Sequence, residues 1–292
     1  KIGPATMISF RRRALLSVAL AYASASGSAS SFSIPSDPFV RHSLSSSASS
    51  SNVPVRPTFL GLGPSAPLRE GTLLVAPLDE YDHFLMKSAV YVFDIGEDEN
   101  GDGTVVRAAI VDHPTAFTVG EMMGDGGEAA VSPLGGLGDN ALFRGGESGD
   151  RAVLMIHSVP GLEGSVPIGE EGGMYQGGVG SGVRAVEEGA AEKSQFKFLF
   201  NYMEFGFEEL RELMDKSSLS VGDDGALDGW MALGDVPSQV VLDGSYGRGD
   251  AWSRLRKMFW NERRDAGATI SSSRKKVNSE TKKRGTGLPP PS

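Results

Sequence analysis

Two short apolar runs separated by a polar insert mark the point where a packable domain begins. The runs are Leu73 to Ala76 and Ala89 to Phe93, and the insert contains Pro77, Asp79 and His83. Runs of about 4–8 apolar and β-branched residues between turn formers are typical of strands. The pattern therefore predicts a strand, a loop and a second strand, with the rest of one domain built on that pair.

The same apolar pattern recurs along the chain and predicts further strands. They are Val105 to Val111, Ala152 to Ser158, Gln195 to Phe205 and Val240 to Leu242. Pro114 lacks an N–H group, so the strand before it must stop there. Apolar residues at helical spacing predict two amphipathic helices that pack on a core, with Asp250 as the N-cap of the second. These residues are Phe207, Leu210, Leu213 and Met214, and then Trp252, Leu255, Met258 and Phe259.

Charge divides the chain into three parts. Residues 1–70 have a net charge of +5, residues 71–262 have −20, and residues 263–292 have +6. An acidic core repels phosphate backbones, so the folded part is not expected to bind nucleic acid unless a metal or the basic tail supplies the attraction. The chain has no cysteine, which excludes disulfides, thiolate metal sites and a cysteine nucleophile.

The N-terminal residues resemble a targeting sequence. Arg11 to Arg13 precede an apolar run from Ala14 to Ala23 and then small residues, which is the order of a signal peptide. The run is far shorter than the roughly 20 residues that span a bilayer. A disordered serine- and alanine-rich tail is the alternative interpretation.

A serine-rich, acid-poor segment follows the expected cleavage near Ala29, with Phe32 close behind it. A signal peptide before a segment of transit-peptide character resembles the two-part plastid presequence of algae with secondary plastids. We therefore expect a plastid protein, with secretion as the alternative. The absence of cysteine argues against secretion. The predicted organisation is a presequence at 1–67, a domain at 68–262 and a disordered basic tail at 263–292.

The order of several segments resembles the YqgE/AlgH family over roughly residues 68–262. The segments that carry the resemblance are Gly71 to Ala76, Phe84 to Tyr91, Asp112 to Thr115, Gly145 to Glu147, Val153 to Ser158 and Asn201 to Arg211. The resemblance implies a single compact α+β domain with a bent, barrel-like mixed β-sheet flanked by a few helices. It implies no established activity. Family members carry the label of transcriptional regulator, which the acidic core does little to support.

Five positions depart from the family pattern. Asp112 and His113 replace Asn and Arg, Glu147 replaces Pro, Phe205 replaces Trp, and Glu209 replaces Gln. If the pattern marks a binding site, its charge has changed in this chain. A ligand held by the usual arginine would lose bidentate contacts here.

Catalytic patterns are weak in this sequence. No G-x-S-x-G turn is present, and Ser158 points to the opposite strand face from its neighbour His157, which disfavours a hydrolytic triad. His83, His113 and His157 with nearby carboxylates could bind a divalent metal, but no H-x-x-x-H spacing supports this. The Asp- and Gly-rich segment from Gly96 to Thr104 lacks the calcium-loop pattern and indicates a hairpin turn.

The favoured hypothesis is a non-catalytic plastid domain, with no cofactor, that binds a protein or a small ligand. Polar residues at strand ends are common positions for such sites. The candidate binding residues are Asp112, His113, Pro114, Arg144, Gly145, Gly146 and His157. The competing hypothesis is a divalent-metal-dependent hydrolase that uses the strand-end histidines and carboxylates. No stretch of the sequence predicts a transmembrane segment.

Overall fold

The computed structural model describes residues 56–98, 101, 103–123, 134–170, 173–216, 220–221, 227–266 and 268–269. The predicted presequence up to residue 55 and the predicted tail from residue 270 lie outside these described residues. Within the described part, no helix is long and apolar enough to cross a membrane.

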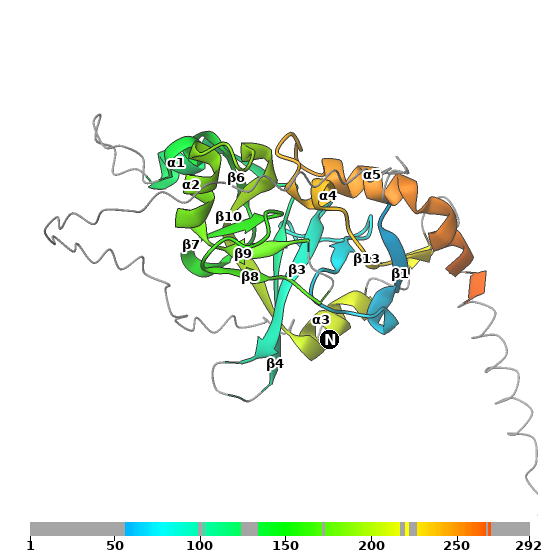
Figure 1. Cartoon of the computed structure of the whole chain (residues 1–292). Coiled ribbons are helices and arrows are strands. Elements are labelled where there is room, and N and C mark those ends of the chain that lie inside the picture. Colours follow the sequence, from blue (N-terminus) through cyan, green and yellow to red (C-terminus); the bar gives the residue numbers. More distant parts are fainter. Residues whose placement is uncertain are drawn as a thin grey trace, which may run out of the picture. The chain divides into compact units, whose positions relative to one another are not determined.

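One eleven-stranded sheet forms the centre of the fold (Figure 1). Its first strands, in spatial order, are β1 (Thr58–Leu62), β13 (Met231–Gly234), β2 (Leu73–Val75), β3 (Ala89–Glu97) and β4 (Thr104–Ile110). The order continues with β10 (Phe196–Gly206), β7 (Ser148–His157), β9 (Tyr175–Gly177) and β8 (Ser165–Pro167). Strand β6 (Ala141–Arg144) pairs with β10, and β5 (Pro114–Thr118) pairs with β6. The β6–β10 pair is parallel, and the other pairs in the sheet are antiparallel.

Helices lie on both sides of this sheet. They are α1 (Val119–Met123), α2 (Val179–Glu187), α3 (Phe207–Lys216), α4 (Ser238–Leu242) and α5 (Asp250–Met258). Short 3₁₀ turns are Gly63–Ser65, Gly135–Asp139 and Lys193–Gln195, and β11 (Ser220–Val221) pairs with β12 (Leu227–Asp228). Figure 1 shows α4 and α5 along one side of the sheet and α3 on the other. The α+β class and the mixed sheet are therefore confirmed, and the sheet is not closed.

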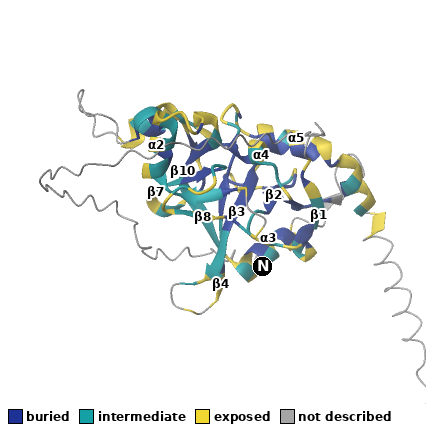
Figure 2. Cartoon of the chain, in the orientation of Figure 1, coloured by how far each residue is buried: buried dark blue, intermediate teal, exposed yellow. Residues whose placement is uncertain are grey.

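Strand β10 is buried between two apolar clusters. Leu199 belongs to the main cluster, which contains most of β2, β3 and β13, whereas Phe196 and Phe198 belong to a smaller cluster near α1 and α2. Figure 2 shows the buried residues concentrated in these central strands. Successive side chains of a strand point to opposite faces, so Lys197 shares the main-core face with Leu199.

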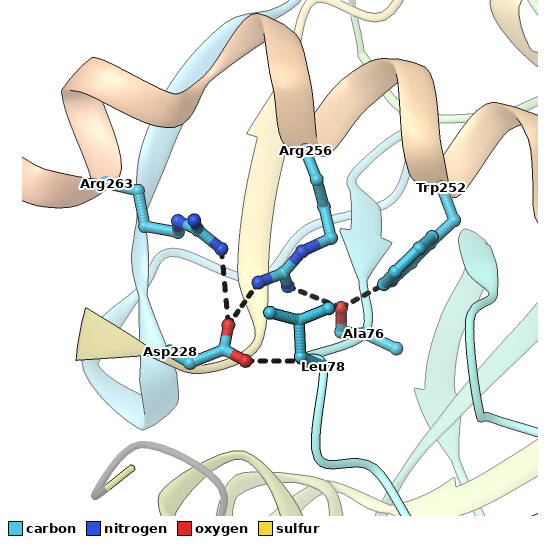
Figure 3. A network of polar contacts seen from close by, with 6 residues as sticks. All are labelled: Ala76, Leu78, Asp228, Trp252, Arg256 and Arg263. Atoms are coloured by element: carbon cyan, nitrogen blue, oxygen red, sulfur yellow. Dashed lines mark hydrogen bonds and ion pairs between the residues drawn. The ribbon is translucent and has the colours of Figure 1, made fainter. Parts of the chain in front are cut away.

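A buried polar network fastens α5 and the residues after it to the sheet (Figure 3). Its members are Ala76, Leu78, Asp228, Trp252, Arg256 and Arg263. The carbonyl of Ala76 accepts hydrogen bonds from Trp252 Nε1 at 2.7 Å and from Arg256 Nη1 at 2.8 Å. Asp228 pairs with Arg256 and, at 3.3 Å, with Arg263. Because all three charged side chains are buried, removal of Asp228 would leave two buried guanidinium groups without their shared carboxylate.

Most predicted elements are confirmed with small shifts at their ends. The strand pair at the start of the pattern is β2 and β3, and the two amphipathic helices are α3 and α5. The prediction of a strand at Val240–Leu242 is wrong, because these residues belong to α4. Asp250 is the first residue of α5, and Gly249 occupies the N-cap position.

The described fold extends past both predicted domain boundaries. Strand β1 lies before residue 68 and pairs with β13, so part of the predicted presequence belongs to the sheet. At the other end, Arg263 lies within the predicted tail, yet it is buried against Asp228. The pairing partner of each segment is far away in the sequence, so local composition did not reveal it.

Candidate functional site

Asp112 is fully buried and joins two distant elements. Its carboxylate accepts a hydrogen bond from the backbone N–H of Ala89 in β3 and another from Trp252 in the first turn of α5, both at 3.1 Å. Its carbonyl also accepts from Gly249 at 3.3 Å. Burial raises the pKa of Asp112 to about 6, although these hydrogen bonds oppose the rise. The structure gives Asp112 no exposed surface for a ligand.

Lys197 is a buried cation that the sequence interpretation overlooked. Its side chain is only 1% exposed, and Nζ donates to the carbonyl of Asp243 at 2.9 Å and lies 3.8 Å from the centre of the Phe143 ring. Burial lowers the pKa of Lys197 to about 7, while the negative charge of Asp112 opposes that fall. The sequence feature that could have revealed it is a lysine within an apolar strand, which is typical of a strand buried on both faces.

An open polar groove of about 720 Å³ lies beside this lysine. Asp243, Ser158, Gln195 and Ser238 are among the residues that line it. Lys197 itself is not at the groove surface, and it reaches the groove only through its bond to the Asp243 carbonyl. The groove therefore offers hydroxyl and amide groups, with the amine of Lys197 behind its wall.

His113 lies just beneath a different part of the surface, with 7% of the residue exposed. Its Nε2 atom has no hydrogen-bond partner among the described residues, so the ring nitrogen that bonds to the Lys87 backbone is Nδ1. Burial, then the charges of Arg248 and Arg144, lower the pKa of His113 to about 4. The ring is therefore neutral near pH 7.

Two exposed arginines reach adjacent residues of the loop between β2 and β3. The guanidinium of Arg144 stacks on the Phe84 ring, 4.2 Å from its centre, and Arg248 donates to the carbonyl of His83 at 2.9 Å. Arg144 has one weak ion pair, with Glu147 at 3.8 Å. Among the described residues, Arg248 has no carboxylate partner. The two positive charges are thus largely uncompensated.

Lys87 adds a third cation to this place. It is exposed, and its φ of 54° lies in the left-handed region that lysine seldom adopts. Backbone strain of this kind is concentrated at functional sites in proteins. We call Lys87, Arg144 and Arg248, which lie around His113, the cationic face.

The predicted glycines and proline have structural roles that the structure explains. A Cβ atom on Gly145 would lie 2.3 Å from the Asn201 carbonyl oxygen, and one on Gly146 would lie 2.2 Å from the Tyr202 carbonyl carbon. Only glycine allows these close approaches to β10. Pro114 is exposed, opens β5 and pairs with Phe143.

His157 lies apart from the cationic face. It is fully buried at the end of β7, its ring stacks on Tyr175 with centres 5.5 Å apart, and its Nδ1 accepts from Val159 N–H at 3.3 Å. Burial lowers its pKa. Within the described ranges, no group of three or more His, Asp and Glu residues could hold a metal ion.

The structure therefore brings together only part of the predicted site. Of the predicted residues, His113 and Arg144 lie close together, and Lys87 and Arg248, which were not predicted, lie beside them. Arg248 lies in a glycine-rich turn far along the sequence, and no pattern there indicated a role.

No protein-family model and no curated protein matches the chain. Among solved structures, protein DIP2367 from Corynebacterium diphtheriae is similar, with a TM-score of 0.46, 14% identity and coverage of 65% of this chain and 87% of that protein. The solution structure of AlgH from Pseudomonas aeruginosa is also similar, with a TM-score of 0.42, 12% identity and coverage of 66% and 90%.

Proposed function

We propose that this chain is a non-catalytic binding domain whose contact surface is the cationic face. The observation that carries the proposal is electrostatic. Residues 71–262 have a net charge of −20, yet the charges of Arg144 and Arg248 act on one buried histidine whose ring bonds to the Lys87 backbone. Among the described residues, these three cations make a single weak ion pair. Uncompensated cations on an acidic protein attract an anionic partner to one place.

Exposed apolar side chains lie on the same loop as Lys87. Tyr81 is 90% exposed, and Leu78 and Met86 are also exposed. Aromatic residues, methionine and arginine are enriched at protein interfaces, and a few such residues carry most of the binding energy. This composition supports a binding role for the surface around the loop.

Charge reversal at the two arginines tests the proposal. The wild-type chain and an Arg144→Glu/Arg248→Glu variant are immobilised and exposed to an extract of plastids. Arg184→Glu is the matched control, because Arg184 is an exposed arginine on α2, away from this loop. We expect at least tenfold less specific capture by the double variant and unchanged capture by the control. Equal capture by all three proteins would reject the cationic face as the contact surface.

The proposed place of action is the plastid. The basic, apolar and serine-rich order of residues 1–67 supports this address. A fluorescent reporter fused behind these residues should accumulate in plastids of an alga with secondary plastids. Export of the reporter to the medium would favour secretion instead.

A further inference from the structure

The two arginines of the cationic face reach two adjacent residues of one loop. Their guanidinium groups contact His83 and Phe84, which are consecutive residues with Cα atoms about 3.8 Å apart. Both side chains are exposed, so a ligand can approach them from solvent. A guanidinium presents its N–H groups as a planar fork that matches the oxygens of carboxylates and phosphates.

His113 is held beneath this pair in a defined state. The bond to the Lys87 backbone fixes its ring, and Nε2 is buried without a hydrogen-bond partner among the described residues. An unpaired buried nitrogen is costly, and burial, followed by the two neighbouring positive charges, keeps a proton away from it. An anion bound between the arginines would offset those charges.

We propose that Arg144 and Arg248 together hold a phosphomonoester group above His113, and that His113 takes up a proton when this group binds. The inference rests on the proposed function and names the chemistry of its ligand. A phosphomonoester carries a charge of about −1.5 to −2 near pH 7, which matches two guanidinium groups, whereas a carboxylate matches one. Other titratable groups at this place are Glu147, which pairs with Arg144 at 3.8 Å, and His83, whose carbonyl accepts from Arg248. The buried carboxylate of Asp112 precedes His113 in the chain, and Lys87 is exposed.

Calorimetric titration of the full chain tests the ligand class. The probes are inorganic phosphate, a phosphoserine peptide, its unphosphorylated form and acetate. We expect binding of phosphate or of the phosphopeptide, no binding of acetate or of the plain peptide, and at least tenfold weaker binding by Arg144→Gln/Arg248→Gln. Preference for the phosphopeptide identifies a phosphorylated protein as the source, and equal affinity identifies a small phosphate compound. Arg184→Gln is the control and should bind like the wild type.

The proton uptake needs a probe that does not itself titrate, and sulfate is a dianion throughout the useful range. Its affinity should rise as the pH falls from about 7 toward about 4, and the total rise approaches roughly tenfold for each unit by which the anion raises the His113 pKa once the pH is below the free value of about 4. Titrations in buffers of different ionisation enthalpy should show net proton uptake, which His113→Phe abolishes. Phosphate binding that is equal in wild type and Arg144→Gln/Arg248→Gln, or absent from both, would overturn the inference. If extract capture still depends on the two arginines in that case, the binding domain stands and only its ligand class is wrong.

Discussion

The carboxylate of Asp112 accepts a hydrogen bond from the backbone N–H of Trp252, 140 residues later in the sequence, at a distance of 3.1 Å. Its other oxygen accepts from Ala89 at the same distance. One buried side chain thus ties β3 to the first turn of α5. The residue next to it, His113, lies beneath the cationic face. The residue that links β3 to α5 and the residue beneath the proposed binding surface are therefore neighbours in the chain.

We expect Asp112→Ala to lower the free energy of unfolding by about 2–4 kcal/mol, because it leaves two buried N–H groups without acceptors. Urea unfolding followed by tryptophan fluorescence measures the change. Asp139→Ala, at an exposed aspartate, is the control and should change the free energy by less than about 0.5 kcal/mol. If both variants unfold at the same urea concentration, the fastening role of Asp112 is wrong.

The pKa of Asp112 predicts a pH dependence of stability. Burial raises this pKa to about 6 in the folded protein, above its ordinary value of 3.8, so the folded state binds the proton more tightly than the unfolded chain does. Ionised Asp112 therefore lowers stability above about pH 6, and this loss is recovered as the pH falls toward 4. As the pH is lowered from 7 to 4.5, the unfolding free energy of wild type should therefore rise relative to that of Asp112→Asn. A constant difference between the two proteins contradicts the assignment.

Lys197 predicts a dependence at higher pH. Burial lowers its pKa to about 7 from an ordinary 10.5, so the unfolded chain binds the proton more tightly between these values. The wild-type protein should gain stability from this residue as the pH rises from about 7 to about 10. Lys197→Met keeps the approximate volume and removes the titrating group, so its stability should rise less over the same range. Urea unfolding at both pH values measures these changes. If the unfolding free energy changes equally in the two proteins between pH 7 and pH 10, Lys197 is not buried.

Gly146 should tolerate no side chain. A Cβ atom there would lie 2.2 Å from the Tyr202 backbone, so we expect Gly146→Ala to cost at least about 3 kcal/mol of stability or to prevent folding. Gly180→Ala is the control, because its Cβ would meet no atom within 4 Å and its helix gains from alanine. Thermal unfolding compares them, and similar melting temperatures would contradict the close approach.

Sequence patterns predicted the elements in which buried apolar residues are consecutive or recur at helical spacing. The apolar runs at Leu73–Val75 and Ala89–Phe93 and the helical spacing of α3 became the expected elements. Val240–Leu242 did not, because a short apolar run fits a buried helix as well as a strand. The presequence composition concealed β1, whose partner β13 lies about 170 residues away in the chain.

The candidate site was predictable only in part for a related reason. His113 and Arg144 stand at strand ends, where polar residues attract notice. Lys87 and Arg248 reach the same place through a left-handed turn and a loop before α5, and neither conformation is encoded in a residue pattern. A polar residue or a glycine that is needed inside the fold can also resemble a binding residue in the sequence, as Asp112 and Gly146 show.

The pKa of His113 tests the arrangement of the cationic face most directly. Its imidazole signal can be followed by proton NMR against pH in wild type, in Arg144→Gln/Arg248→Gln and in Arg184→Gln. The structure predicts a value near 4 in wild type and in the Arg184 variant, and a clear rise when the two neighbouring cations are removed. A value near 6.5 in wild type would mean that the His113 ring is not buried, and the same value in all three proteins would mean that the arginines do not converge on it.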